Sequence, residues 1–272
     1  MSLTYRRLIL SLHASLRERE NAVNEIRWLI EAFSGEDFLT LDPEAEVADV
    51  APYDRAVKRL KKHEPFQYVV GMQQFYGYDF FVNPSVLIPR PETELLVEKA
   101  VFWGKGKEVK ALDLCTGSGC IAIALAHELK GSFLATDISE KALATAEKNN
   151  VLNGTKVEFR LSDLFFHLEK EQRFDLITAN PPYLTQKEMT EIPLEVTHEP
   201  VIALNGGSNG IYAIERILKD VDHFLAEGGL FLMEIGENQG ETVLSLAEKY
   251  GLENTAIEKD LNGKDRIFRL EK

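Results

Sequence analysis

Cysteine is scarce in this sequence, which has two in 272 residues, Cys115 and Cys120. Two cysteines cannot build the disulfide framework on which small secreted proteins depend. No histidine stands beside them at a zinc-binding spacing, so we expect no metal site. We interpret both cysteines as small buried residues around a turn.

Long hydrophobic runs are absent as well. No apolar stretch approaches the ~20 residues that cross a bilayer. The stretch Leu8–Leu12, which follows two arginines, is too short for the core of a signal peptide. We therefore expect a cytoplasmic protein without membrane association.

Basic residues are in deficit. The 31 lysines and arginines face 44 aspartates and glutamates, which gives a formal net charge of −13. Proteins that bind nucleic acid through its phosphates need a basic surface instead. The composition therefore disfavours direct binding to nucleic acid.

The first third of the chain has the pattern of helices. Apolar residues recur at helical spacing over 5–16 and 22–33, and a third such pattern covers 53–62. The composition then changes. The stretches 67–70 and 74–82 are rich in aromatic and β-branched residues, with glycines between them. These two stretches predict a β-hairpin.

From Pro91 onwards, strand patterns alternate with helix patterns. Alternation of this kind predicts an α/β fold, a parallel, doubly wound sheet with helices on both faces. We therefore expect three parts in the chain, a helical domain over 1–66, a β-hairpin linker over 67–85 and an α/β domain over 86–272.

A glycine-rich turn follows the predicted strand 109–114 and opens a helix. Gly117 and Gly119 let the backbone turn sharply, and the helix N-terminus offers free N–H groups to an anion. Asp137, at the end of the next strand, can accept both hydroxyls of a ribose. Asp113, ahead of the glycines, would repel a pyrophosphate but suits an ammonium group. The turn therefore favours S-adenosylmethionine, which carries a carboxylate, an ammonium group and a ribose, over a dinucleotide.

Asp163 follows the third predicted strand of this sheet. Its carboxylate is placed to accept a hydrogen bond from an adenine amino group, with Leu164 and Phe165 packing on the ring. A role as a helix cap or turn residue is the alternative.

The tetrapeptide Asn180-Pro-Pro-Tyr183 follows an apolar strand. Proline fixes its own backbone and restricts the residue before it, so this loop is rigid. It can present the side-chain oxygen of Asn180 and the carbonyl of Pro181 side by side as acceptors for a planar NH₂ group, on which Tyr183 can stack. Such a site would hold an amide or amino nitrogen ready to accept a methyl group, by positioning and electrostatics alone.

These segments form part of a longer pattern, and together they resemble the glutamine N5-methyltransferases that modify peptide chain release factors (the PrmC/HemK family). The segment Ile88–Glu94 is the most specific, because enzymes that methylate amino groups of DNA and RNA share the tetrapeptide. The resemblance is carried by Pro65–Tyr68 with Gly71, Phe75–Gly77, Ile88–Glu94, Asp113–Gly119, Asn180–Tyr183, Glu199–Gly207, Glu234–Gly236 with Gln239, and Asp260–Arg266.

The resemblance implies a class I methyltransferase fold with a seven-stranded sheet, and a helical N-terminal domain that helps to dock the substrate. It implies S-adenosylmethionine as cofactor and, as substrate, the glutamine of a Gly-Gly-Gln loop in release factors. It also implies a monomer. Asn180 and Pro181 would hold the glutamine amide, while Pro182 and Tyr183 line its slot. The expected cofactor contacts are Asp113, Thr116, Gly117, Ser118, Gly119, Cys120, Asp137, Asp163, Leu164 and Asn180.

The sequence departs from the family pattern at Cys115, where glycine is expected, and at Asn209, where aspartate is common. Some roles stay open. Arg90 and Glu94 are equally suited to an internal salt bridge and to substrate contact. Glu234 is equally suited to the core and to the wall of an active site.

Three alternatives compete with a release factor methyltransferase. The same chemistry could act on a glutamine of a ribosomal protein. An N-methyltransferase could use the tetrapeptide to grip an exocyclic amino group of a flipped base, although the net charge of −13 disfavours this. A cofactor-binding scaffold without activity is the third alternative, and the intact tetrapeptide disfavours it.

Overall fold

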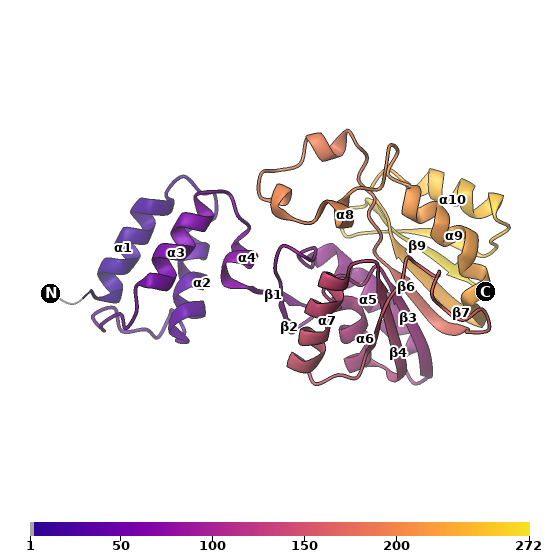
Figure 1. Ribbon diagram of the computed structural model, residues 1–272, viewed down its shortest axis with the longest axis horizontal. Coiled ribbons are helices and arrows are strands. Elements are labelled where there is room, and N and C mark those ends of the chain that lie inside the picture. Colours follow the sequence, from indigo (N-terminus) through magenta and orange to yellow (C-terminus); the bar gives the residue numbers. More distant parts are fainter. Residues whose placement is uncertain (1–2) are drawn as a thin grey trace. The chain divides into compact units, whose positions relative to one another are not determined.

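The computed structural model describes residues 3–272 (Figure 1). The chain divides into two compact units. The helical unit contains the residues up to Gly71 together with Pro193–His198, and the sheet unit contains Met72–Ile192 and Glu199–Lys272. Within residues 3–272, no helix is both long and apolar enough to cross a membrane.

The helical unit is built on apolar stripes. Leu8, Leu12 and Leu16 are buried on one face of the first helix, as their spacing predicts. The second helix ends at Gly35, whose φ of 74° suits a residue without a side chain. The helices are α1 (Tyr5–Leu16), α2 (Ala22–Ser34), α3 (Ala51–Leu60) and α4 (Phe66–Val70).

The short segment Pro193–His198 belongs to the helical unit, although it follows the tetrapeptide in sequence. The carboxylate of Glu195 lies 3.8 Å from the Arg19 guanidinium and 3.4 Å from Nδ1 of His63. Nε2 of His198 lies 3.1 Å from the carbonyl oxygen of Lys62. Polar contacts therefore join this segment to the helices.

The prediction of a strand over 67–70 is wrong, since these residues form α4. Pro65 stands before the helix with its φ fixed by its ring, and Gly71 ends it with a φ of 82° while donating to the Gln67 carbonyl. Burial of Tyr68 and Val69 outweighs the strand preference of the valines. The hairpin begins later, with β1 (Met72–Phe75) paired to β2 (Tyr78–Phe81).

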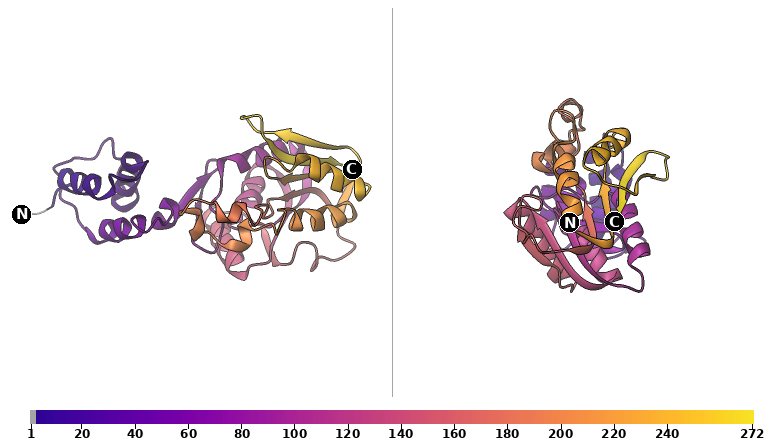
Figure 2. Two further views of the ribbon diagram at one scale, coloured as in Figure 1. Left: turned by 90° about the horizontal axis from the view of Figure 1, so that it is seen from above. Right: turned by 90° about the vertical axis from the view of Figure 1, so that its right-hand side faces the viewer.

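The sheet unit contains the seven-stranded sheet that the resemblance implies, in the order β5-β4-β3-β6-β7-β9-β8. The first five of these strands are parallel, and β9 runs antiparallel to both of its neighbours. The C-terminal strands β8 and β9 extend the sheet beyond β7 (yellow in Figure 2). The strands are β3 (Glu108–Leu114), β4 (Lys130–Asp137), β5 (Glu158–Leu161), β6 (Phe174–Ala179), β7 (Leu225–Glu234), β8 (Thr255–Lys259) and β9 (Asp265–Glu271).

Helices cover both faces of this sheet, as the alternation predicts. The apolar side chains of α5 and α6 share one core with the sheet, and those of α9 and α10 share the other. Strand order reverses between β3 and β6, and in such sheets ligands bind beyond the carboxyl ends of the strands at the reversal. The helices are α5 (Pro91–Gly104), α6 (Cys120–Glu128), α7 (Glu140–Leu152), α8 (Val201–Leu204), α9 (Tyr212–Phe224) and α10 (Gly240–Lys249), with short 3₁₀ turns at Glu188–Thr190 and Val196–His198.

Candidate active site

A cavity of about 620 Å³ lies at the carboxyl ends of the central strands, within the sheet unit. Most of the residues expected to bind the cofactor line it, although they come from four separate stretches of the chain. The predicted site residues in its lining are Thr116, Gly117, Ser118, Cys120, Asp137, Asp163, Leu164, Asn180 and Pro182. Four others, Asp113, Gly119, Pro181 and Tyr183, lie outside the lining.

The glycine-rich turn is fixed by Asp137. One oxygen of this carboxylate accepts from the Gly117 amide at 2.9 Å, and the other accepts from the Ser139 amide at 2.9 Å. Burial raises the pKa of Asp137, and these two hydrogen bonds oppose the rise. The carboxylate therefore holds the turn and borders the cavity, with lone pairs left for a hydroxylated ligand.

Glycine is required at one position of this turn. Gly119 has a φ of 81°, and a side chain there would meet Cβ of Ala146 and Cδ1 of Ile123 at 3.1 Å each. Cys115, at the position where the family pattern has glycine, also has a positive φ of 57°. The turn therefore adopts a glycine-like backbone at a residue that has a side chain.

Three buried polar atoms beside the turn make no hydrogen bond of good geometry among residues 3–272, although the Thr116 hydroxyl lies close enough to Asp113 to lower its pKa. They are Oδ2 of Asp113, Oγ1 of Thr116 and Oγ of Ser118. Oδ1 of Asp113 accepts from the Thr178 hydroxyl at 2.7 Å, while burial raises the pKa of Asp113 to about 7. Buried polar groups are normally paired, so these atoms fit a ligand that brings donors and acceptors of its own. S-adenosylmethionine, with an ammonium group and a carboxylate, meets that requirement.

Asp163 has a partner that the sequence did not reveal. Its two oxygens accept from Nη1 and Nη2 of Arg216 at 2.9 and 2.8 Å, and both residues line the cavity. Leu164 lies beside them with a φ of 52°. Phe165 lies outside the cavity lining, and its packing on an adenine ring stays a prediction. It stacks on Phe224 in the core at 4.6 Å, where its apolar ring gains more from burial.

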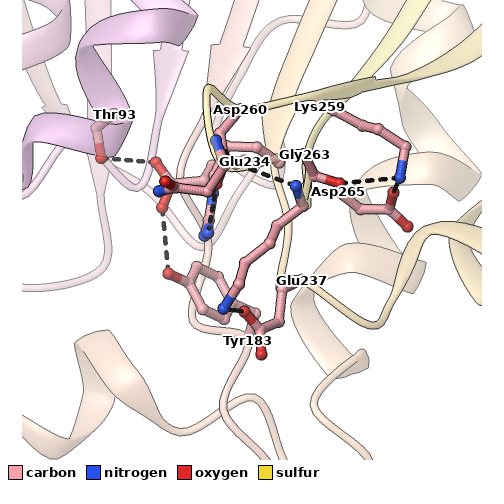
Figure 3. A network of polar contacts seen from close by, with 11 residues as sticks. Thr93, Tyr183, Glu234, Glu237, Lys259, Asp260, Gly263 and Asp265 are labelled. Carbon is pink, nitrogen blue, oxygen red and sulfur yellow. Dashed lines mark hydrogen bonds and ion pairs between the residues drawn. The ribbon is translucent and has the colours of Figure 1, made fainter.

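The tetrapeptide is tied to a buried carboxylate that the sequence left unassigned. Nδ2 of Asn180 donates to Glu234 at 3.1 Å, and the Tyr183 hydroxyl donates to the other oxygen of Glu234 at 3.1 Å. Thr93, on α5, donates to Glu234 at 2.6 Å (Figure 3). Burial raises the pKa of Glu234 and also that of Tyr183. Glu234 therefore supports the wall of the site from within the core.

The segment Ile88–Glu94 supplies the structure beside the tetrapeptide. Arg90 lines the cavity and forms an ion pair with Glu199, which also accepts from the Ile88 amide at 3.1 Å. Glu94 accepts from the Tyr76 amide at 2.9 Å. Both residues therefore have partners within the sheet unit.

Sequence reasoning missed Thr93, Glu199 and Arg216. Thr93 and Glu199 do lie in segments that carry the resemblance, which was a usable signal. Their partners stand 141 and 109 residues away along the chain, so no local pattern identifies the pairs. Arg216 had no signal beyond the helical pattern around it.

Comparison with known proteins finds two matching families along the chain. The methyltransferase small domain family matches residues 91–207, and the PrmC N-terminal domain family matches residues 8–71. A release factor glutamine methyltransferase of Koribacter versatilis is 42% identical over 236 residues, covering 85% of this chain and 83% of the relative. The corresponding protein of Flavobacterium psychrophilum is 38% identical over 241 residues, with 85% of both chains covered.

Among solved structures, a 16S rRNA methyltransferase of T. thermophilus, in complex with AdoMet and guanosine, has a TM-score of 0.56. It is 19% identical, over 74% of this chain and 49% of that one, and it shows the shared fold. The sequence relatives show more, because they extend along most of both chains. The chain belongs to the release factor glutamine methyltransferase family.

Proposed function

We propose that this protein transfers a methyl group from S-adenosylmethionine to the side-chain amide nitrogen of the glutamine in the Gly-Gly-Gln loop of peptide chain release factors. The proposal rests on family membership and on one feature of the site. Asn180 borders the cavity with its amide nitrogen bonded to Glu234, so its carbonyl oxygen is left as an acceptor. Release factors act in translation, so the expected location is the cytoplasm.

The cofactor would be held by the turn and its neighbours. When bound, S-adenosylmethionine supplies a methyl group activated by its sulfonium. The backbone N–H groups of 116–120 would receive its carboxylate, and Asp113 would face its ammonium group. Asp137 would accept from the ribose hydroxyls. Asp163 and Leu164 would border the adenine, although both oxygens of Asp163 already accept from Arg216.

The substrate amide needs help, because its nitrogen lone pair is delocalised into the carbonyl. Oδ1 of Asn180 and the carbonyl of Pro181 would accept its two N–H hydrogens, which aims the nitrogen at the cavity. Acceptance of both bonds favours positive charge on nitrogen as the new bond forms, and the proton can leave afterwards. Pro182 and Tyr183 would line the slot for the planar amide. Positioning of this type can contribute roughly 7–11 kcal/mol to lowering the barrier.

The helical domain, predicted over 1–66, would dock the release factor, and the hairpin region 67–85 would link it to the methyltransferase domain over 86–272. The family resemblance supports this assignment. We expect no direct binding to nucleic acid and a monomeric enzyme.

A methyl-transfer assay tests the proposed function. The protein is incubated with labelled S-adenosylmethionine and a purified release factor, and peptide mass spectrometry maps the label. We expect a single methyl group on the Gly-Gly-Gln glutamine. Transfer to a ribosomal protein or to RNA in the same assay, with none to the release factor, would contradict the proposal.

A further inference from the structure

The carboxylate of Glu234 collects hydrogen bonds from three side chains. Oε2 accepts from the Thr93 hydroxyl at 2.6 Å and from Nδ2 of Asn180 at 3.1 Å, and Oε1 accepts from the Tyr183 hydroxyl at 3.1 Å. Glu234 is 2% exposed. Figure 3 shows it between Thr93 on one side and the Tyr183 ring on the other. A buried charge is tolerated only with such partners, so this arrangement is specific rather than incidental.

The bonds to Glu234 decide which way the Asn180 amide faces. An amide has donors at its nitrogen end and an acceptor at its oxygen end, and an ionised carboxylate can only accept. Glu234 therefore selects the orientation in which the nitrogen of Asn180 turns to the core. The oxygen then turns away, and it has no hydrogen-bond partner among residues 3–272. A free acceptor at the cavity wall recognises a group that donates.

Positive charge nearby supports the ionised form. Arg266 interacts electrostatically with both Glu234 and Tyr183. The guanidinium is anchored on Asp260, at 3.1 Å from Nη2. The Thr93 and Tyr183 hydroxyls and this cation oppose burial, which together with the nearby Glu92 raises the pKa of Glu234.

We propose that Glu234 is a positioning residue, which holds Asn180 and Tyr183 so that the Asn180 oxygen faces the substrate and accepts from its NH₂ group. This inference rests on the proposed function for its catalytic consequence. Glu234 itself need not touch the substrate. It would set a requirement for a donating nitrogen, which amides meet and carboxylates do not.

Glu234→Gln tests the inference, because glutamine keeps the size of the side chain but replaces one acceptor by a donor. With ¹⁵N-labelled asparagine, the side-chain NH₂ signal of Asn180 is identified by its absence in Asn180→Ala. We expect this signal to shift in Glu234→Gln. Turnover of the release factor should fall by about 10- to 100-fold, with cofactor affinity unchanged.

A double-mutant cycle separates positioning from general damage. If Glu234 acts through Asn180, then Glu234→Gln should cost less than about 3-fold when added to Asn180→Ala. Glu128→Gln is the matched control, since that carboxylate also accepts from a tyrosine hydroxyl, that of Tyr78 at 2.9 Å, and does not line the cavity. It should leave the Asn180 signal and turnover unchanged. If Glu234→Gln fails to fold, Thr93→Val replaces it as the test, because it removes one donor to the same carboxylate. Thr93→Ser keeps a hydroxyl donor and should restore the turnover lost in Thr93→Val.

The outcomes are distinct. An unmoved Asn180 signal, or losses that multiply in the double variant, would overturn the inference. A wild-type protein that does not methylate the release factor would refute the proposed function, while the Asn180 signal would still report whether Glu234 orients the amide.

Discussion

At the residue scale, Asn180 has two faces with different partners. Its nitrogen donates to Glu234 and Thr93, at 3.1 and 3.3 Å, and its oxygen has no partner among residues 3–272. The rigidity of the tetrapeptide could be predicted from the sequence, since prolines restrict the backbone wherever they occur. The hydrogen-bonding groups of its first residue, Asn180, are also evident from the residue type. The orientation of the amide could not be predicted, because Glu234 lies 54 residues further along the chain.

Asn180→Ala should keep cofactor binding and lose roughly 10²–10³ in turnover, because one preorganised polar partner of the amide is removed. Calorimetric titration with S-adenosylmethionine and a single-turnover assay measure the two quantities. Undiminished turnover would contradict the positioning mechanism.

Asp113 should give the protein a specific pH dependence. Its pKa is raised from 3.8 to about 7 by burial, so between these values the folded state binds more protons than the unfolded state. The contribution of this group to stability therefore falls as pH rises through that window. Asp113→Asn should gain stability relative to the wild type between pH 4 and pH 7, measured as urea denaturation without cofactor. Parallel pH profiles for the two proteins would refute the assignment.

At the scale of elements, local patterns predicted the alternation of strands and helices well. They failed at 67–70, where α4 depends on the cap at Gly71 and on burial of Tyr68 and Val69. They also gave no sign that Phe165 stacks on Phe224 of α9, because the two residues are far apart in sequence. The order of the strands in the sheet could not be predicted from local patterns, because pairing between distant segments leaves no periodic trace.

A side chain at Gly119, in the turn between β3 and α6, should destabilise the fold more than one at an open glycine. Gly119→Ala combines a positive φ with contacts at 3.1 Å, whereas Gly154, with a φ of 65°, has open space around it. Gly154→Ala should cost about 1–2 kcal/mol from its backbone alone, and Gly119→Ala should cost more. Urea denaturation of both variants, without cofactor, measures the difference. Equal losses in the free energy of unfolding would show that the contacts around Gly119 do not contribute to the cost of a side chain there.

At the scale of the whole molecule, the division into units does not follow the order of the chain. The chain enters the helical unit a second time, at Pro193–His198, between the tetrapeptide and α8. Composition and periodicity could not predict this return, because the segment is short and its contacts with Arg19 and His63 are far away in sequence.

Removal of residues 1–71 should therefore loosen Pro193–His198 while the sheet unit still binds S-adenosylmethionine. Glutamyl endopeptidase should cut after Glu195 faster in the shortened chain, since that carboxylate has lost its partners. Cleavage after the exposed Glu171, in the sheet unit, should proceed equally in both chains. Equal rates after Glu195 would mean that the helices do not protect the segment.

The return of the chain also constrains how such proteins can recombine. A chimera that exchanged residues 1–71 between two relatives would combine one parent's helices with the other parent's Pro193–His198. The residue at position 195 from one parent would then lie beside the residues at positions 19 and 63 from the other parent. An exchange would keep the native contacts only if both stretches came from the same parent, although more than a hundred residues separate them.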